Sequence, residues 1–277
     1  MRKKPAKNKT LYYYMKQKTS SYNSIEKAMR VLMAFSVDQP TWGVRELSTH
    51  LGFSPATVQR ILQTLKRFAF VDQDRDTRQY RLGNIYFRFM DILQSTHTVN
   101  RAALPHMKQL MSRTQETVHL NVIDGMERIC INAVESPQLL KAVMPIGSRS
   151  PLYAGASSKC LLAFSADDFI GHYLESVRLV PVTRHTIVRI DALKGEILKI
   201  KQQGYAISLG ERTPGLGSLS APVLDPQGIG LAALSLAIPE IRFRQKRHLS
   251  LCIKELLSAA EKISEDMGYD HLTSRFC

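Results

Sequence analysis

Two short helical patterns joined by a tight turn, in residues 44–66, constrain the fold of this chain more than any other segment. The first pattern repeats apolar side chains on one helix face, at Val44, Leu47 and Leu51. Gly52 follows at once and tolerates the left-handed conformation that commonly ends a helix. Ser54 is a typical N-cap residue, and Pro55 takes the first helical position, where its missing N–H group costs nothing. The junction therefore predicts a helix, a turn and a second helix.

The second helical pattern has one apolar and one polar face. The apolar face repeats at helical spacing, at Val58, Ile61, Leu62 and Leu65. The polar face carries side chains that suit base edges and phosphates, at Thr57, Gln59, Arg60, Gln63 and Thr64. Two helices of an ordinary helical core would show the same spacing, so spacing alone does not decide. The turn residues and the charge distribution favour a helix-turn-helix, whose second helix enters the major groove of DNA.

Positive charge is concentrated around this segment. The formal net charge of the 277 residues is +14. Residues 1–83 carry 16 lysine and arginine residues against 6 aspartate and glutamate residues, whereas the remainder carries 22 against 18. Such an excess is expected of an element that neutralises phosphates. With 44% hydrophobic residues the chain can bury a proper core, and its length suits two domains.

The sequence also indicates a compartment. No apolar run is long enough to span a bilayer, and residues 11–15 are too short for the core of a signal peptide. The four cysteines show no short paired spacing, at Cys130, Cys160, Cys252 and Cys277. Reduced thiols in a cytosolic protein are the simplest interpretation. We expect a cytoplasmic protein that associates with the nucleoid when it is bound to DNA.

The segments before the helix-turn-helix read as a basic arm and a first helix. Residues 1–22 contain seven lysine and arginine residues and no acidic residue, which is typical of a solvated, flexible arm. An alternative is that the arm reaches along the DNA backbone or into a minor groove. Asn23 and Glu26 form a capping-box pattern that begins a helix. Its apolar stripe is expected to pack beneath the two later helices, through Ile25, Ala28, Met29, Leu32 and Phe35.

A hairpin and a further helix are expected after the second helix. Residues 69–71 and 79–82 predict two short strands around a polar tip at 72–78, so residues 23–83 form a winged helix-turn-helix. Arg75 and Arg78 on the wing are expected to contact phosphate or minor groove; the alternative is that they only pair with the neighbouring aspartates. The predicted linker helix at 84–98 is apolar over much of its circumference, which makes it a candidate dimer contact.

Residues 99–277 change to a mixed pattern. Hairpins are predicted around the turn Asp124-Gly125 and around residues 225–228, and another strand at 205–208. Helices are predicted near residues 107–111, at 156–164 and 192–201, and from about 244 to 267. Strands in hairpins mixed with helices indicate an α+β domain with a mainly antiparallel sheet.

Several separated segments together resemble the IclR family of bacterial transcription regulators, from about Asn23 to Met267. They are S-I-E-K-A-M-R-V-L, R-E-L-S-T-H-L-G-F-S-P-A-T-V-Q-R-I-L-Q-T-L, Y-R-L-G, T-Q-E-T-V-H-L-N-V-I-D-G, S-P-L-Y-A-G-A-S-S-K-C-L-L-A, G-Y-A-I-S-L-G-E and A-P-V-L-D-P-Q-G. The resemblance implies an N-terminal winged helix-turn-helix, a linker helix and a C-terminal GAF-like α/β effector domain. It further implies homodimers or homotetramers on palindromic operators, and a small organic acid or aromatic metabolite as effector.

The resemblance also places an effector pocket. It implies that Gly155 and Ala156 offer backbone N–H groups to the ligand, at a helix N-terminus that favours an anion. Polar positions of relatives align with Pro222, Ser235 and Ala237, of which only Ser235 has a hydroxyl. A bulkier or less polar ligand is therefore expected to fit better than a small carboxylate.

The motifs of an enzyme are weak or absent in the sequence. There is no G-x-S-x-G, no P-loop and no H-E-x-x-H. The segment 215–217 lacks the third glycine of a dinucleotide fingerprint, and Cys160 is expected to be a buried structural thiol. Some relatives hold a metal in the effector domain, which would make His119 and His172 the residues to test, but no histidines lie at metal-ligand spacing. We expect no enzyme activity, cofactor or metal.

The sequence therefore predicts a sequence-specific transcription regulator, expected to be a repressor, whose operator binding is controlled by a small metabolite. Base edges and adjacent phosphates are expected to contact Ala56, Thr57, Gln59, Arg60 and Gln63. Positioning on the duplex is expected from Arg45, Ser54 and Arg78. The alternative is a non-specific or architectural DNA binder that uses the basic arm and whose C-terminal domain only oligomerises.

Overall fold

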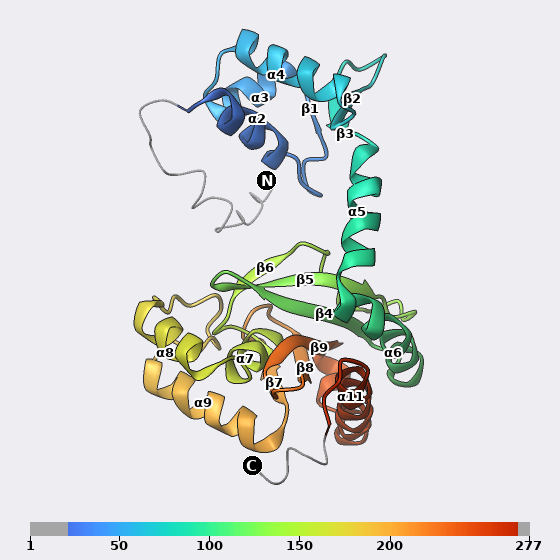
Figure 1. Cartoon of the computed structure of the whole chain (residues 1–277), viewed down its shortest axis with the longest axis vertical. Helices are drawn as coiled ribbons and strands as arrows, with labels where there is room; N and C mark the ends of the chain where they lie inside the picture. Colours follow the sequence, from blue (N-terminus) through green and yellow to red (C-terminus); the bar gives the residue numbers. More distant parts are fainter. Residues whose placement is uncertain (1–21, 271–277) are drawn as a thin grey trace. The chain divides into compact units, whose positions relative to one another are not determined.

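The computed structural model of the chain describes residues 22–270, which divide into two compact units between Thr96 and His97 (Figure 1). Each unit has a core of its own. The predicted basic arm lies outside the described residues, apart from Tyr22. Within residues 22–270, no helix combines the length and the apolar character that a membrane crossing requires.

The first unit is a winged helix-turn-helix, as predicted. Its helices are α2 (Ser24–Met33), α3 (Val44–Leu51), α4 (Pro55–Arg67) and α5 (Ile85–Thr96). Its three-stranded antiparallel sheet has the order β1 (Thr41–Trp42), β3 (Tyr80–Leu82) and β2 (Val71–Gln73). The core joins all of α2, α3, α4 and the sheet, through Val31, Leu47, Val58, Leu62, Leu65, Val71 and Tyr80. The sheet is thereby fixed beside α4.

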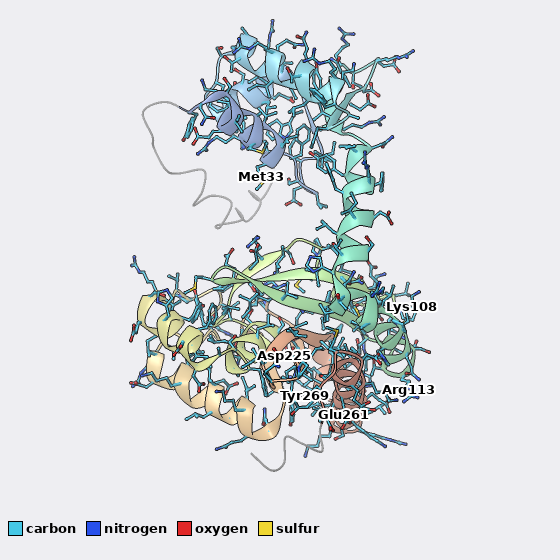
Figure 2. All side chains as sticks on the ribbon, in the orientation of Figure 1. Met33, Lys108, Arg113, Asp225, Glu261 and Tyr269 are labelled. Carbon is cyan, nitrogen blue, oxygen red and sulfur yellow. The ribbon has the colours of Figure 1, made fainter. Side chains whose placement is uncertain are left out.

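The prediction for the buried face of α2 is right for Leu32 and Phe35, which pack against the core, and wrong for Ile25 and Met29. Ile25 is 71% exposed and Met29 is 53% exposed, whereas Val31 is fully buried. Met33, at the end of α2, is also exposed (Figure 2). The helix carries two apolar stripes, and helical spacing cannot tell which of them faces a partner. Contacts with α3 and α4 select the face that contains Val31, Leu32 and Phe35.

The first strand of the wing lies two residues later than predicted, and the second strand begins one residue later. Ala69 has a left-handed backbone, with φ of 59°, and therefore does not begin a strand. The first strand begins at Val71 and includes Asp72, which was expected in the hairpin tip. The side chain of Arg81 on β3 bonds Asp72 at 3.0 Å, and this hydrogen bond holds the pKa of Asp72 below its usual value. The two-residue strand β1 was not predicted.

The second unit is built on one six-stranded antiparallel sheet. In sheet order, its strands are β6 (Arg149–Pro151), β5 (Glu127–Val134), β4 (Thr117–Asp124), β9 (Gly230–Pro239), β8 (Leu216–Leu224) and β7 (Ala206–Leu209). Its helices are α6 (Thr98–Thr114), α7 (Ala156–Ala163), α8 (Asp167–Ser176), α9 (Ile190–Gln203), α10 (Glu240–Phe243) and α11 (Lys246–Asp266). The predicted α+β class with a mainly antiparallel sheet is confirmed.

The two faces of this sheet pack against different helices (Figure 1). The outer face packs on α6 and α11, around residues such as Leu120, Leu234 and Leu256. The other face, which we call the inner face, packs on α7, with α8 and α9 beyond it. Side chains alternate between the two faces along each strand. Leu234 and Leu236 of β9 point outward, so Ser235 between them points to the inner face.

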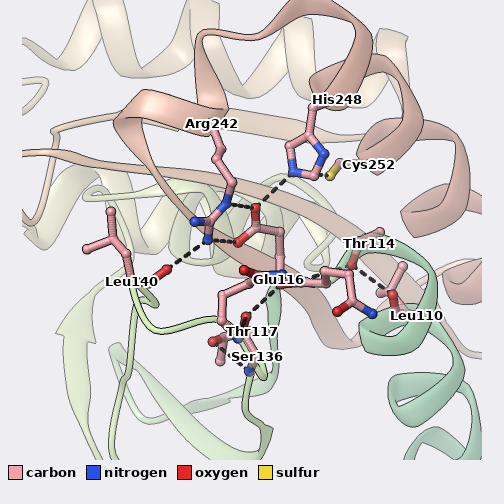
Figure 3. Close-up of polar contacts among 11 residues, drawn as sticks. Leu110, Thr114, Glu116, Thr117, Ser136, Leu140, Arg242, His248 and Cys252 are labelled. Atoms are coloured by element: carbon pink, nitrogen blue, oxygen red, sulfur yellow. Dashed lines mark hydrogen bonds and ion pairs between the residues drawn. The ribbon is translucent and has the colours of Figure 1, made fainter.

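A buried ion cluster ties the start of β4 to α10 and α11 (Figure 3). Glu116 is fully buried and accepts two hydrogen bonds from Arg242, at 2.6 and 2.7 Å. His248 Nε2 contacts the same carboxylate at 2.8 Å. Arg242 also donates to the carbonyl oxygen of Leu140 at 3.0 Å. The cluster therefore anchors the loop that contains Leu140.

Candidate nucleic-acid interface and small-molecule pocket

Backbone capping fixes the turn between α3 and α4. Gly52 has φ of 72°, and its N–H group donates to Ser48. The Ser48 hydroxyl donates to the carbonyl oxygen of Phe53 at 2.6 Å. Ser54 caps α4 by accepting from the N–H group of Thr57, and the hydroxyls of Ser54 and Thr57 lie 2.9 Å apart. The start of α4 is thus held by bonds within the turn itself.

The outer face of α4 is polar and free of acidic side chains. Ala56, Arg60 and Gln63 are exposed, on the side opposite the buried Val58 and Leu62. Within residues 22–270 the side chain of Arg60 forms no ion pair. Such a face offers hydrogen-bond donors and acceptors to a ligand without repelling phosphates.

Gln59 is placed differently from its neighbours on α4. It is half-buried, and its amide nitrogen donates to the hydroxyl of Tyr80 on β3 at 3.3 Å. This bond joins the helix to the wing. The amide of Gln59 is therefore partly engaged within the protein, whereas Arg60 and Gln63 are free to reach outward.

An open pocket of about 560 Å³ lies between α4, the start of α3 and the wing. The predicted residues Arg45, Gln59, Gln63 and Arg78 all line it. The lining side chains that sequence reasoning missed include Lys66, Gln73, Thr77 and Tyr80. Glu46 is the single acidic lining residue, and its carboxylate accepts from the N–H group of Gly43 at 3.0 Å. The lining is therefore basic overall.

The arginines at the tip of the wing are exposed. Asp74 accepts hydrogen bonds from Thr77 and from the N–H group of Asp76, which form the tip. In the described part of the chain, neither Arg75 nor Arg78 forms an ion pair with an aspartate. The alternative that they only pair with neighbouring aspartates is therefore wrong.

In the second unit, the predicted N–H donors at the start of α7 already have partners. The N–H group of Gly155 donates to the carboxylate of Glu211 at 3.1 Å, and that of Ala156 donates to the hydroxyl of Ser208 at 3.0 Å. Glu211 in turn bonds the buried Lys159 at 2.6 Å. The chain's own carboxylate therefore occupies the N-terminus of α7.

The other predicted pocket residues share the inner face of the sheet. Pro222 and Ala237 lie on β8 and β9, at positions that alternate with outward-facing core residues. Ser235 is 3% exposed and accepts from Asn121 at 3.2 Å. Asn121 accepts in turn from Arg128 at 3.1 Å. A polar network thus crosses the inner face from β9 to β5.

Sequence reasoning missed the most unusual residues of this face. Arg128 is fully buried, and its Nη1 lies 3.0 Å from the sulfur of Met144. Nη1 of Arg212 lies 2.9 Å from the same sulfur. Arg128 is two residues from Cys130 on β5 and therefore shares its face, and this spacing was the one available signal that it points into the protein.

Burial shifts the pKa values of a histidine and a cysteine in the second unit. His119 is 1% exposed, and burial, aided by the positive charge of Arg128, lowers its pKa to about 4. Burial raises the pKa of the Cys160 thiol to about 12. Cys130, Cys160 and Cys252 are unpaired. His172 lies apart on α8 and is exposed, and within residues 22–270 no three metal-binding side chains gather as an ion site.

The family models match both units. Residues 24–75 match the IclR helix-turn-helix domain, and residues 91–265 match the bacterial transcriptional regulator IclR C-terminal domain. The HTH-type transcriptional regulator KdgR of Escherichia coli is 33% identical over 250 residues, which cover 90% of this chain and 94% of that protein.

Solved structures share the fold. The IclR of Thermotoga maritima is 29% identical, with a TM-score of 0.77 over 89% of this chain and 99% of that one. An IclR homologue from Microbacterium hydrocarbonoxydans, solved in complex with 4-hydroxybenzoate, has a TM-score of 0.77 at 20% identity, over 89% of this chain and 99% of that one. At that identity the second likeness shows the fold alone.

Proposed function

This chain belongs to the IclR family of bacterial transcriptional regulators, and we propose that it reads a palindromic operator with the outer face of α4. The observation that carries this proposal is a polar helix face without acidic side chains, capped at Ser54 and bordered by a basic pocket. In this arrangement Arg60 and Gln63 reach base edges, while Arg45 and Arg78 hold the phosphates on either side. The predicted outcome is repression, and the chain acts without catalysing a reaction.

The control of DNA binding is proposed to come from the second unit. Its effector lies between the start of α7 and the inner face of the sheet, where Gly155, Ala156, Pro222, Ser235 and Ala237 lie. Pro222 and Ala237 give this wall an apolar character, which favours a ligand with a sizeable apolar body. A thermal-shift panel in which only small, highly polar acids stabilise the protein would contradict that preference.

Sequence selection from random duplex DNA, at two salt concentrations, tests the reading of the operator. We expect a recovered palindrome whose half-sites lie about one or two helical turns apart. Binding to it should exceed binding to random DNA by roughly a thousandfold or more at physiological salt. Salt-sensitive binding without an enriched motif would instead support an architectural DNA binder. We propose that the protein works in the cytoplasm and lies on the nucleoid when bound.

A further inference from the structure

Arg128 is a buried cation that has only neutral partners. Its Nε and Nη2 atoms donate to the hydroxyl of Ser150, at 3.0 and 2.8 Å. Its Nη1 donates to the amide oxygen of Asn121 and, at 3.4 Å, to the carbonyl oxygen of Ser148. Burial, and to a smaller extent the positive charge of Arg212, lowers the pKa of Arg128 to about 9. A buried charge is costly unless a group of opposite charge pairs with it.

A second arginine faces the first across one sulfur atom. Arg212 donates to Met144 Sδ at 2.9 Å, and Arg128 donates to the same sulfur at 3.0 Å. A thioether sulfur is a weak acceptor and carries no charge. Within residues 22–270, neither arginine forms an ion pair with a carboxylate. Two positive groups therefore converge on an uncharged sulfur atom. The charge of Glu127 raises the pKa of Arg128, but the Glu127 carboxylate bonds Arg149, at 3.4 Å, and not Arg128.

Two further polar atoms beside these arginines lack partners. His119 Nε2 and the hydroxyl of Ser148 are buried without a hydrogen-bond partner among the described residues. His119 lies two residues before Asn121 and therefore on the same inner face of β4, and Asn121 bonds Arg128. Burial and the positive charges of Arg128 and Arg212 lower the pKa of His119. Buried polar atoms are nearly always satisfied in folded proteins. These two atoms are therefore available to bond a polar ligand.

The helix N-terminus that would usually bind an anion in this region already has a partner. The N-terminus of α7 favours a negative charge, but the carboxylate of Glu211 occupies it and is neutralised by Lys159. Lys159 also bonds Glu196 at 2.9 Å. This end of the pocket therefore holds two carboxylates against one ammonium group, whereas no carboxylate is bonded to Arg128 or Arg212 in the described part of the chain.

Met144 belongs to a loop that is fixed at both ends. This loop, residues 136–148, is called the cover loop below. At one end Ser136 donates to the carbonyl oxygen of Gln115 at 2.6 Å, and Arg242 of the buried ion cluster holds Leu140 (Figure 3). At the other end the N–H group of Gly147 donates to Cys130 at 2.7 Å. Met144 lies between these anchors, so its side chain can leave the arginines without loss of the anchors.

We propose that Arg128 and Arg212 together bind the carboxylate of the effector, which takes the place of the Met144 sulfur. Two guanidinium groups on one carboxylate supply several charge-assisted hydrogen bonds and remove the charge imbalance. Asn121 and His119 lie beside this carboxylate position and contact the adjoining polar atoms of the ligand. This proposal rests on the proposed function, because it names the class of effector as an organic acid and the residues that hold its acid group.

The first test needs no identified ligand, because a substitution in the protein supplies the negative charge. Met144→Glu puts a carboxylate where the sulfur lies, and Met144→Gln is the neutral control of the same size. We expect the full chain with Met144→Glu to melt about 5 °C above the Met144→Gln chain. A melting temperature of Met144→Glu at or below that of Met144→Gln would overturn the proposal.

Added acids test the two arginines directly. The probes are acetate and 4-hydroxybenzoate, each compared with its neutral amide at constant ionic strength. We expect the acids alone to raise the melting temperature, and Arg128→Met and Arg212→Met to abolish the rise. Arg178→Met, an exposed arginine of the same unit, should keep it. Equal shifts with acid and amide, shifts that persist without either arginine, or no shift with both acids would each overturn the proposal.

Operator binding separates this inference from the proposed function. We expect Met144→Glu and Met144→Gln to differ in operator affinity by at least tenfold, because only the first resembles the occupied state. If Met144→Glu melts higher while both variants bind the operator equally, the anion site stands and the control of DNA binding by the second unit fails. If no operator can be selected at all, the melting experiments still decide the anion site.

Discussion

At the scale of single residues, Arg60 is the side chain on which base reading depends most. It lies on the exposed face of α4, between the capped start of the helix and its last turn. Its guanidinium suits a bidentate pair with guanine. We expect Arg60→Ala to cost about 1–3 kcal/mol on the selected operator and to relax base preference at one position.

The matched control for Arg60 lies at the end of the same helix. Arg67 is exposed in the last turn of α4, and its guanidinium lies over the ring of Phe68. Arg67→Ala should leave base preference unchanged in competition binding. If Arg60→Ala instead weakened binding equally on all sequences, Arg60 would be a phosphate contact.

His119 makes the stability of the chain depend on pH. Burial and the nearby Arg128 lower its pKa from 6.5 to about 4. Between these two pH values the His119 side chain is protonated in the unfolded chain but neutral in the folded chain. The free energy of unfolding therefore falls as pH falls. The loss reaches about 3 kcal/mol below pH 4 and is absent above pH 7.

Urea unfolding at several pH values checks this contribution. His119→Gln should unfold with a weaker pH dependence between pH 7 and pH 4 than the natural chain. His172→Gln, which changes an exposed histidine on α8, should keep the dependence. Parallel curves for the natural chain and His119→Gln would show that His119 has no such role.

Among single residues, sequence reasoning found those whose role is local. Ser54 and Gly52 act on the backbone within a few positions, so composition and spacing suffice to find them. The role of Arg128 depends on Met144 and on Asn121, which come from other segments of the sheet and from a loop. The spacing of these residues in the sequence does not indicate that their side chains come together in the fold.

At the scale of elements, the best predictions are those in which capping and periodicity agree. The capping box of Asn23 and Glu26 begins α2 as predicted, with bonds of 2.8 and 2.9 Å. The hairpins β4–β5 and β8–β9 were also predicted. The strand β1 was missed because its two residues become a strand only by pairing with β3. The elements α8, β6 and α10 were not predicted.

The wing contains a glycine that no other residue can replace without movement. A Cβ atom at Gly83 would lie 2.1 Å from the carbonyl oxygen of Ala69. That oxygen belongs to a backbone that also holds the left-handed turn after α4, so it has little freedom to move. We expect Gly83→Ala to destabilise the first unit by about 1–3 kcal/mol.

Thermal unfolding compares this change with a harmless one. A Cβ atom at Gly195, inside α9, meets nothing within 4 Å. Gly195→Ala should therefore stabilise the second unit by about 1 kcal/mol through its helix preference. Gly83→Ala variants that melt like the natural chain would contradict the contact argument for the wing.

At the scale of the whole molecule, α5 is expected to join two copies of the chain. Its exposed apolar side chains follow one another closely, with Phe87 72% exposed and Leu93 57% exposed. Met90, between them, is also exposed. Apolar surface of this kind is rarely left in water by a soluble protein. Phe87→Glu and Leu93→Glu should shift sedimentation toward smaller species.

A control for self-association comes from the second unit. Leu198 on α9 is 60% exposed, whereas the nearby apolar residues Ile197 and Ile200 are buried. Leu198→Glu should leave the sedimentation of the chain unchanged. Equal sedimentation of the α5 variants and the natural chain would rule out α5 as the contact.

The unbalanced charge of Arg128 and Arg212 bears on how long the protein persists in a cell. A ligand that supplies the missing negative charge binds the folded chain and not the unfolded chain, so it reduces the unfolded fraction by mass action. Cellular proteases remove proteins from that fraction. A scarcity of effector would then shorten the half-life of the regulator, and abundance of effector would lengthen it. The number of regulator molecules, and not only their affinity for DNA, would follow the supply of the acid.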